Sequence, residues 1–328
     1  MKRRIFFGAL GALCCATAAI VALPAQAQRG NVLNLVVPYP AGGGTDFFAR
    51  TVAPRMGIAL KQTVVVENKP GASGMIAATA VAHNMPADGN TVLLGDTGTY
   101  ALNPSLYKNL AYNVQKDLAP VGMTARFAYL LVVNPKLLPQ VTDVKSLIAE
   151  VHKHPDGLYY ASPGIGTPHH LVTETFKNQL HLKLTAVVYK GGAPAMQDVI
   201  AGQVPLMFLD LATAQQQVRA GTLRAIATAS EHRLPQFPNV PTLAESGLPG
   251  FSAYAWQGLT VRAGTSKQAI DRINAAYQFA VSDPAVREKL LHAGIEVQTS
   301  TPEAFGAYIK SETKRWGDVI RANHISLQ

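Results

Sequence analysis

The chain has almost no cysteine. Among its 328 residues only Cys14 and Cys15 carry a thiol, and both lie in an apolar segment near the start. If that segment is removed on export, the remaining chain has no cysteine at all. Disulfides, thiol nucleophiles and cysteine-ligated metals are then excluded together.

The first residues have the pattern of an export signal. Lys2, Arg3 and Arg4 precede an uncharged run from Ile5 to Leu23, and small residues at Ala25 and Ala27 suit signal peptidase. We expect residues 1–27 to be a signal peptide cleaved after Ala27 and the mature protein to be periplasmic. A retained membrane anchor and twin-arginine export are the alternatives.

The chain also lacks a strongly charged region. The formal charge is +9, and removal of the three basic residues of the signal leaves +6. Basic residues are scattered without a run of five like charges, and aromatic residues make up 7% of the chain. This composition gives little support to nucleic-acid binding and suits the approach of small anions, so we expect no nucleic-acid partner.

Familiar catalytic and cofactor motifs are missing. The triple glycine at 42–44 lacks the Gly-Lys-Ser/Thr ending of a nucleotide loop, and no G-x-G-x-x-G, G-x-S-x-G or H-E-x-x-H sequence occurs. The pair His152 and His154, and the group His169, His170 and Glu174, resemble metal ligands only loosely and are better explained as surface or helix residues. We expect no cofactor, no metal and no enzymatic activity; an unrecognised hydrolase or lyase remains the alternative.

What is present is an alternation of short apolar runs with amphipathic segments, which predicts an α/β fold. Most of the runs are continuous rather than alternating, as in parallel strands covered by helices on both faces. Predicted strands are 34–37, 63–67, 91–95, 130–133, 158–161, 185–189, 204–209, 223–229 and 255–261.

The segment VPYPAGGGTD, residues 37–46, is the most informative stretch. A strand leads through three glycines into a helix, so free backbone N–H groups meet the positive end of a helix dipole. This arrangement predicts an anion site, although an ordinary turn with flexible glycines has the same pattern. Three further loops follow predicted strands in the same way, at 95–100, 162–170 and 190–194. Since open α/β sheets bind ligands beyond the carboxyl ends of their strands, the four loops together predict a cleft.

Six ordered segments then carry a family resemblance. They are VPYPAGGGTDFFAR (36–50), VVVENKPGASG (64–74), GDTGTYALNPSLY (95–107), ASPGIGTPHHL (161–171), VVYKGGAPAMQDVIAGQV (187–204) and PTLAESGLPGF (241–251). In sequence and order the chain resembles the periplasmic solute receptors of tripartite tricarboxylate transporters, the TctC-like or Bug family.

The resemblance implies a two-lobed type II periplasmic binding protein fold, in which each lobe is a largely parallel sheet flanked by helices and two crossing segments form the hinge. Lobe one would comprise residues 28–126 and 256–328, and lobe two residues 127–255. The lobes would close over a small organic carboxylate, held by the first glycine loop and a facing loop of lobe two, partly through ordered waters.

Site residues carried over from this resemblance come from both lobes. Gly43, Gly44 and Thr45 would present backbone amides, with a hydroxyl from Thr45, and Thr99 and Tyr100 would line the second loop of lobe one. Ser162, Gly166 and Thr167 would grip the ligand from lobe two, although Thr167 also suits a helix N-cap.

Three further candidates each have more than one interpretation. Tyr39 stands where the family more often has phenylalanine, and its hydroxyl contacts the ligand or reaches solvent. Asp46 is favoured as a residue that orders its loop, caps the helix or pairs with Arg50 rather than as a contact to an anion. Asp210 follows a buried strand, where it binds an ammonium group, rejects a second carboxylate or caps the next helix.

We therefore expect a monomeric receptor that delivers a small organic carboxylate to the membrane subunits of its transporter. A ligand sensor for a membrane signalling partner is the second hypothesis, and the enzyme is the third.

Overall fold

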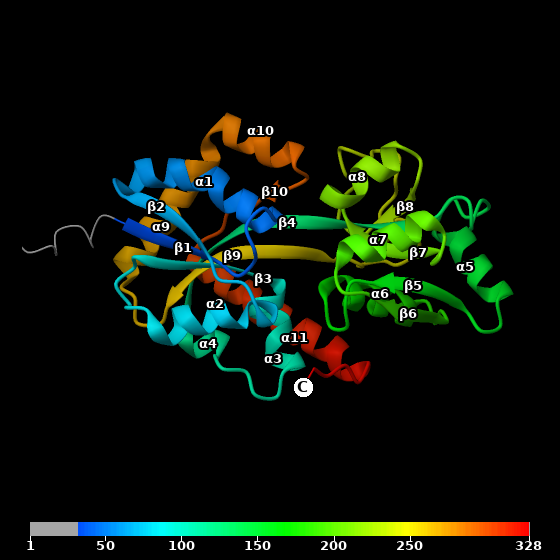
Figure 1. Ribbon diagram of the computed structural model, residues 1–328, viewed down its shortest axis with the longest axis horizontal. Coiled ribbons are helices and arrows are strands. Elements are labelled where there is room, and N and C mark those ends of the chain that lie inside the picture. Colours follow the sequence, from blue (N-terminus) through cyan, green and yellow to red (C-terminus); the bar gives the residue numbers. More distant parts are fainter. Residues whose placement is uncertain (1–31, 328) are drawn as a thin grey trace, which may run out of the picture.

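The computed structural model describes residues 32–327, so the predicted signal peptide and its cleavage point lie outside the described residues. Within this range ten strands form one sheet that runs through both lobes (Figure 1). The spatial order is β2-β1-β3-β9-β4-β7-β5-β6, with β8 and β10 paired to β4. The strands are β1 Val32–Val37, β2 Thr63–Asn68, β3 Thr91–Asp96, β4 Leu118–Val133, β5 Leu158–Ser162, β6 Leu184–Val188, β7 Leu206–Asp210, β8 Arg224–Thr228, β9 Tyr254–Arg262 and β10 Glu296–Val297.

Each lobe is largely parallel. In lobe one β1 pairs parallel with β2 and β3, whereas β9 is antiparallel to both β3 and β4. In lobe two β5 pairs parallel with β6 and β7, and β4 is antiparallel to β7 and β8. The predicted two-lobed α/β fold is thereby confirmed.

Two strands connect the lobes. β4 pairs with β9 as far as Ala128 and then, from Tyr129 onward, with β7 and β8. β9 begins at Tyr254 and returns the chain to lobe one. The lobe boundaries given above, at residues 126–127 and 255–256, stay a prediction, because the division between two lobes is defined by how they move and not by strand pairing alone.

Helices cover both faces of each half of the sheet. In lobe one, α1, α9 and α10 bury apolar residues against one face and α2 and α11 against the other; in lobe two, α7 and α8 cover one face and α5 and α6 the other. The helices are α1 Gly44–Leu60, α2 Met75–Thr79, α3 Asn103–Leu106, α4 Val114–Asp117, α5 Val144–Lys153, α6 Pro168–Gln179, α7 Gly192–Ala201, α8 Leu211–Arg219, α9 Lys267–Ser282, α10 Pro284–His292 and α11 Pro302–Ala322, with short turns of other helix types at Ala72–Gly74, Ala80–Asn84 and Gly98–Leu102.

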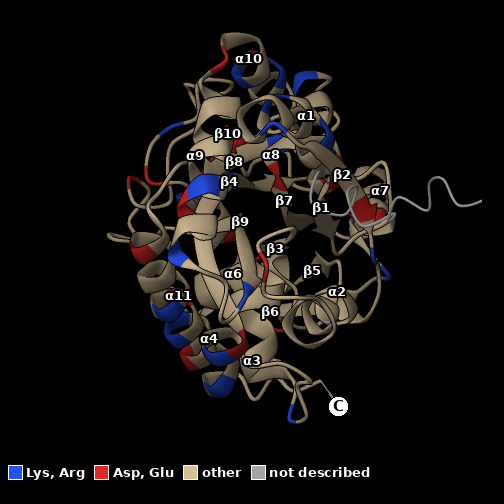
Figure 2. Ribbon diagram, turned by 90° about the vertical axis from the view of Figure 1, so that its left-hand side faces the viewer, with Lys and Arg blue, Asp and Glu red and all other residues tan. Residues whose placement is uncertain are grey.

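Local sequence signals explain where several helices begin. Thr167, Asp283 and Thr301 each cap a helix through the side chain, and each is followed by a proline in the first turn. Proline suits this position because its missing N–H would have no helical partner there. Basic and acidic residues occur together along the outer helix α11 (Figure 2). Among residues 32–327 there is no helix with the length and apolar character needed to cross a bilayer.

Candidate functional site

A cavity of about 690 Å³ lies between the lobes. Its walls come from the start of α1 and the end of β3 in lobe one, the end of β7 and start of α8 in lobe two, the crossing strands β4 and β9, and the loop before β10. The lining residues are Tyr39, Pro40, Ala41, Gly42, Gly43, Gly44, Thr45, Phe47, Asp96, Phe127, Asp210, Ala212, Thr213, Ala255, Trp256, Gln257, Ala293 and Ile295. The cavity therefore lies where ligands bind in open α/β sheets, beyond the carboxyl ends of strands.

The glycine loop forms one wall of this cavity and leads into α1. Gly43 is the N-cap of the helix, and no side chain caps the helix there. The first amides of a helix have no intrahelical acceptor, so they are available to a ligand. A side chain at Gly44 would meet no protein atom within 4 Å. The loop thus presents backbone donors and the positive end of the α1 dipole to open space.

Asp46 stabilises the glycine loop through hydrogen bonds. Its buried carboxylate accepts hydrogen bonds from the Gly42 amide at 2.9 Å and the Asn68 amide group at 2.9 Å, and it pairs with the Arg50 guanidinium at 2.9 Å. These donors, led by Arg50, lower the pKa of Asp46 to about 2. Asp46 does not line the cavity, and its contacts fit the interpretation of a residue that orders its loop; a ligand contact there stays a prediction.

Tyr39 and Asp96 meet in the cavity wall. The Tyr39 hydroxyl donates a hydrogen bond to Asp96 Oδ2, so its hydroxyl has a protein partner. Burial, followed by the charge of Asp96, raises the pKa of Tyr39 well above its usual value. Asp96 Oδ1 in turn accepts hydrogen bonds from the Thr99 amide at 2.9 Å and the Thr99 hydroxyl at 2.8 Å.

Asp210 faces the cavity from lobe two. Its carboxylate accepts a hydrogen bond from the Thr213 hydroxyl at 2.8 Å and lies 3.8 Å from His169 Nε2. Asp210 is the N-cap of α8 by backbone conformation, but its side chain makes no capping hydrogen bond. Burial lowers the pKa of His169, against the opposing charge of Asp210, so the imidazole is neutral near pH 7.

Thr99 and Tyr100 lie behind the cavity wall. Both are fully buried, and neither lines the cavity. The Tyr100 ring stacks on Trp256 with centroids 6.0 Å apart, and its hydroxyl accepts a hydrogen bond from the Gly95 amide at 3.0 Å. The Thr99 hydroxyl donates a hydrogen bond to Asp96. Their predicted contact with a ligand stays untested.

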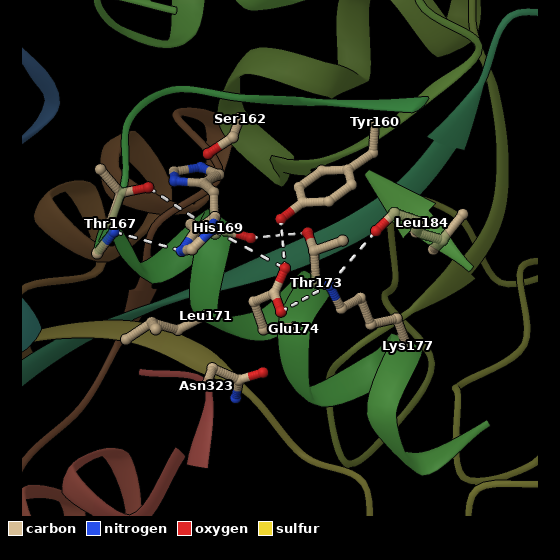
Figure 3. A network of polar contacts seen from close by, with 12 residues as sticks. Tyr160, Ser162, Thr167, His169, Leu171, Thr173, Glu174, Lys177, Leu184 and Asn323 are labelled. Atoms are coloured by element: carbon tan, nitrogen blue, oxygen red, sulfur yellow. Dashed lines mark hydrogen bonds and ion pairs between the residues drawn. The ribbon is translucent and has the colours of Figure 1, made fainter. Parts of the chain in front are cut away.

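Ser162, Gly166 and Thr167 are also outside the cavity lining. They precede α6, and Figure 3 shows Ser162 and Thr167 near the start of that helix. Thr167 is the N-cap of α6, and the hydroxyls of Ser162 and Thr167 both donate to the Gly164 carbonyl. A Cβ at Gly166 would come within 2.9 Å of Leu106, a residue of lobe one. The structure thus places this loop against lobe one rather than along the cavity, and its role as the facing grip stays a prediction.

Sequence reasoning missed several cavity residues. Asp96 is the last residue of a buried strand. Because ligands of α/β proteins bind beyond the carboxyl ends of strands, this position could have indicated a residue that faces the ligand. Gln257 is a polar residue within the mostly buried strand β9, and it is 1% exposed. Within the described chain neither Gln257 amide atom has a hydrogen-bond partner, and the buried Tyr129 hydroxyl has none either. Buried polar atoms without partners are uncommon and indicate a missing ligand or water.

The charges of the site limit its chemistry. No lysine or arginine belongs to the cavity lining, and the described residues contain no group of three or more His, Cys, Asp or Glu side chains placed to hold a metal. The positive character of the cavity comes from backbone amides, and its formal charges are the carboxylates of Asp96 and Asp210.

Comparison with known proteins agrees with this architecture. Residues 48–325 match the model of the tripartite tricarboxylate transporter family receptor. Protein BugT of Bordetella pertussis is 34% identical, with 95% of this chain and 96% of the relative covered. Among solved structures, periplasmic binding protein BugD is 35% identical with a TM-score of 0.75, and an R. palustris protein with adipate is 33% identical with a TM-score of 0.78; each comparison covers 90% of this chain and 98% of the other.

The chain belongs to the tripartite tricarboxylate transporter receptor family, as the six sequence segments predicted. Its similar structures are periplasmic binding proteins, so it is a solute-binding protein rather than an enzyme. These findings confirm the predicted class and fold.

Proposed function

We propose that this protein binds a small organic carboxylate in the cavity between its lobes and delivers it to the membrane subunits of a tripartite tricarboxylate transporter. The main observation is the uncapped start of α1, whose amides and glycines face the cavity. Oriented amides at a helix start stabilise an anion without a formal cation. Adipate in the similar R. palustris structure supports a carboxylate as the ligand.

The proposal includes the cell compartment. The relatives are periplasmic binding proteins, and the charged start and apolar run are those of an export signal. Cleavage after Ala27 and a monomeric mature protein remain part of the proposal. A ligand sensor is the second candidate, because a receptor of this fold can equally present its closed form to a signalling partner. Loss of carboxylate uptake on deletion supports delivery, whereas intact uptake with a lost transcriptional response supports sensing.

The glycine-loop mechanism is tested by calorimetry with Gly44→Val. The ligand is the compound that copurifies with the periplasmic protein, identified by mass spectrometry. We expect an affinity loss of at least about 100-fold, which corresponds to about 2.7 kcal/mol, because the branched side chain would fill the space beside the amides.

Gly192→Val is the matched control. Gly192 is the first residue of α7, just as Gly44 is the first residue of α1, and a Cβ at either position meets no protein atom within 4 Å. Gly192 does not line the cavity, so its variant should bind normally. Equal binding by wild type and Gly44→Val would contradict the proposal, as would a copurified ligand without a carboxylate.

A further inference from the structure

The polar side chains that line the cavity outside the glycine loop define what else the ligand carries. Asp96 and Gln257 are paired residues on the adjacent strands β3 and β9, and both line the cavity. Asp96 already accepts hydrogen bonds from Tyr39 and Thr99. Gln257 is different, because both of its amide atoms are buried and without a partner in the described chain.

An unpartnered amide can offer a ligand two donors and a carbonyl acceptor. Leaving such a group unpaired in a buried site costs free energy, so a ligand that bonds to it gains affinity and one that does not loses affinity. Gln257 therefore suits a ligand group that takes part in hydrogen bonds, and an alkyl end would leave it unsatisfied.

Two aspartate carboxylates of the protein determine which charge that ligand group can carry. Asp96 ends β3 in lobe one and Asp210 ends β7 in lobe two, and both face the cavity. The neighbouring His169 is neutral near pH 7, since burial lowers its pKa. Among residues 32–327 no lysine or arginine lines the cavity, so no basic side chain of the lining balances these two aspartates. A second ligand carboxylate near these aspartates would meet like charges, whereas a hydroxyl or ammonium group would donate hydrogen bonds to them.

We propose that this protein selects a monocarboxylate whose other end carries a hydrogen-bond donor, an alcohol or an ammonium group, held by Gln257 with Asp96 and Asp210, and that it disfavours dicarboxylates. This selectivity rests on the proposed function, since the glycine loop takes the carboxylate at the first end. This preference against dicarboxylates would distinguish the chain from the similar R. palustris protein, whose structure is described with adipate.

Calorimetry with matched linear acids tests the selectivity. The series contains linear acids of four, five and six carbons. At each length the end opposite the carboxylate is a methyl, a hydroxyl, an ammonium or a second carboxylate group. For six carbons the four acids are hexanoate, 6-hydroxyhexanoate, 6-aminohexanoate and adipate. At the best chain length we expect a hydroxyl- or ammonium-ended acid to bind at least tenfold more tightly than both the methyl-ended and the carboxylate-ended acid. Comparison of the affinities of the hydroxyl-ended and ammonium-ended acids shows which donor the protein prefers. Equal or tighter binding of the dicarboxylate or of the methyl-ended acid overturns the inference, and so does binding of none of the acids.

Two variants assign the selectivity to residues. Gln257→Leu keeps the side-chain size but removes the amide, so the donor-ended acid should lose at least tenfold in affinity while the methyl-ended acid changes less than about twofold. Asp210→Asn keeps an acceptor for Thr213 but removes the charge, so the dicarboxylate should gain at least tenfold relative to the donor-ended acid. Gln268→Leu and Asp271→Asn, both exposed on α9, are the controls. A purely structural role for Gln257 or Asp210 would shift all acids alike and would overturn the assignment.

The copurified ligand separates this inference from the proposed function. A dicarboxylate overturns the inference and leaves the carboxylate-binding function intact. A compound without any carboxylate overturns both, and a hydroxy or amino acid supports both.

Discussion

Asp46 illustrates how a single residue can belong to a site without touching the ligand. The glycine loop needs a fixed shape to present its amides, and Gly42 adopts a left-handed backbone with φ +88° that few other residues tolerate. The Asp46 carboxylate accepts a hydrogen bond from the Gly42 amide, and this bond links the turn to the first turn of α1. A carboxylate buried beside an anion site would repel an anion, but this one is balanced by Arg50.

The pH dependence of stability tests this role. The pKa of Asp46 is about 2 in the fold, below the value near 3.9 of an unfolded chain. A lowered pKa stabilises the fold above the unfolded value, and this contribution is lost as the pH falls from about 4 towards 2. Asp46→Asn should lower the free energy of unfolding by about 1 kcal/mol at pH 7, since half-exposed Arg50 is screened by solvent.

Denaturant unfolding of wild type and variant at pH 7, 4 and 3 measures the difference, which should shrink as the pH falls. Asp271→Asn removes the exposed Lys267 ion pair and should cost less than about 0.5 kcal/mol at each pH. A pH-independent difference for Asp46→Asn would contradict the assignment.

Individual residues of the site were predictable to different degrees. The glycine loop and Asp210 could be found because a strand end followed by a helix start is visible in the sequence. Gln257 could not be given a role, because its importance comes from the absence of partners around it in space. The loop from Ser162 to Thr167 has the same local signals as the glycine loop, yet none of Ser162, Gly166 and Thr167 lines the cavity, and their role as the facing grip stays a prediction.

At the scale of elements, β4 differs most from expectation. The sequence predicted a strand at 130–133, whereas β4 runs from Leu118 to Val133. Proline and glycine usually weaken a strand, but β4 has a register irregularity between Pro120 and Gly122, which allows it to continue. Gly122 is required by packing, because a Cβ there would come within 2.6 Å of Asn274 on α9. The two-residue strand β10 is too short for any periodic signal.

The start of α5 offers a test of element stability. Asp143 and Ser146 form a capping box, in which Asp143 Oδ1 accepts from the Ser146 amide at 2.7 Å and Ser146 accepts from the Asp143 amide at 3.0 Å. Asp143→Ala should cost about 1 kcal/mol of unfolding free energy by leaving helix amides unpaired.

Ligand affinity should not change in that variant, because α5 lies at the far end of lobe two and lines no part of the cavity (Figure 1). Thermal unfolding and calorimetry of the same preparation check both statements. Asp143→Asn retains a capping oxygen and should restore most of the stability, and a loss equal to that of alanine would argue against the cap.

At the scale of the whole molecule, the two lobes share one core and touch on one side. One apolar cluster continues from Tyr100 and Trp256 in lobe one to Tyr129 and Phe208 in lobe two. On the side of α6, the Asn178 amide donates to Asn323 at 2.8 Å across the lobes (Figure 3 shows Asn323 beside α6). The two-lobed arrangement was predictable from the order of family segments, whereas these contacts between distant residues were not.

The cavity, in contrast, is open space between residues of both lobes, and this difference predicts domain closure. A ligand held by the start of α1 in lobe one and by Asp210 in lobe two makes its full set of contacts only when the lobes approach. The radius of gyration measured by small-angle scattering should therefore fall on saturation with the copurified ligand. Because the unfolded chain does not bind, ligand at 100 times Kd should also add about 2.7 kcal/mol to the free energy of unfolding. Gly44→Val, with at least about 100-fold weaker binding, should be at most half saturated at the same ligand concentration, so it should gain no more than about 0.4 kcal/mol and show at most half of the change in radius. An unchanged radius together with the full gain in stability would mean that one lobe holds the ligand alone, and closure between the lobes would then be wrong.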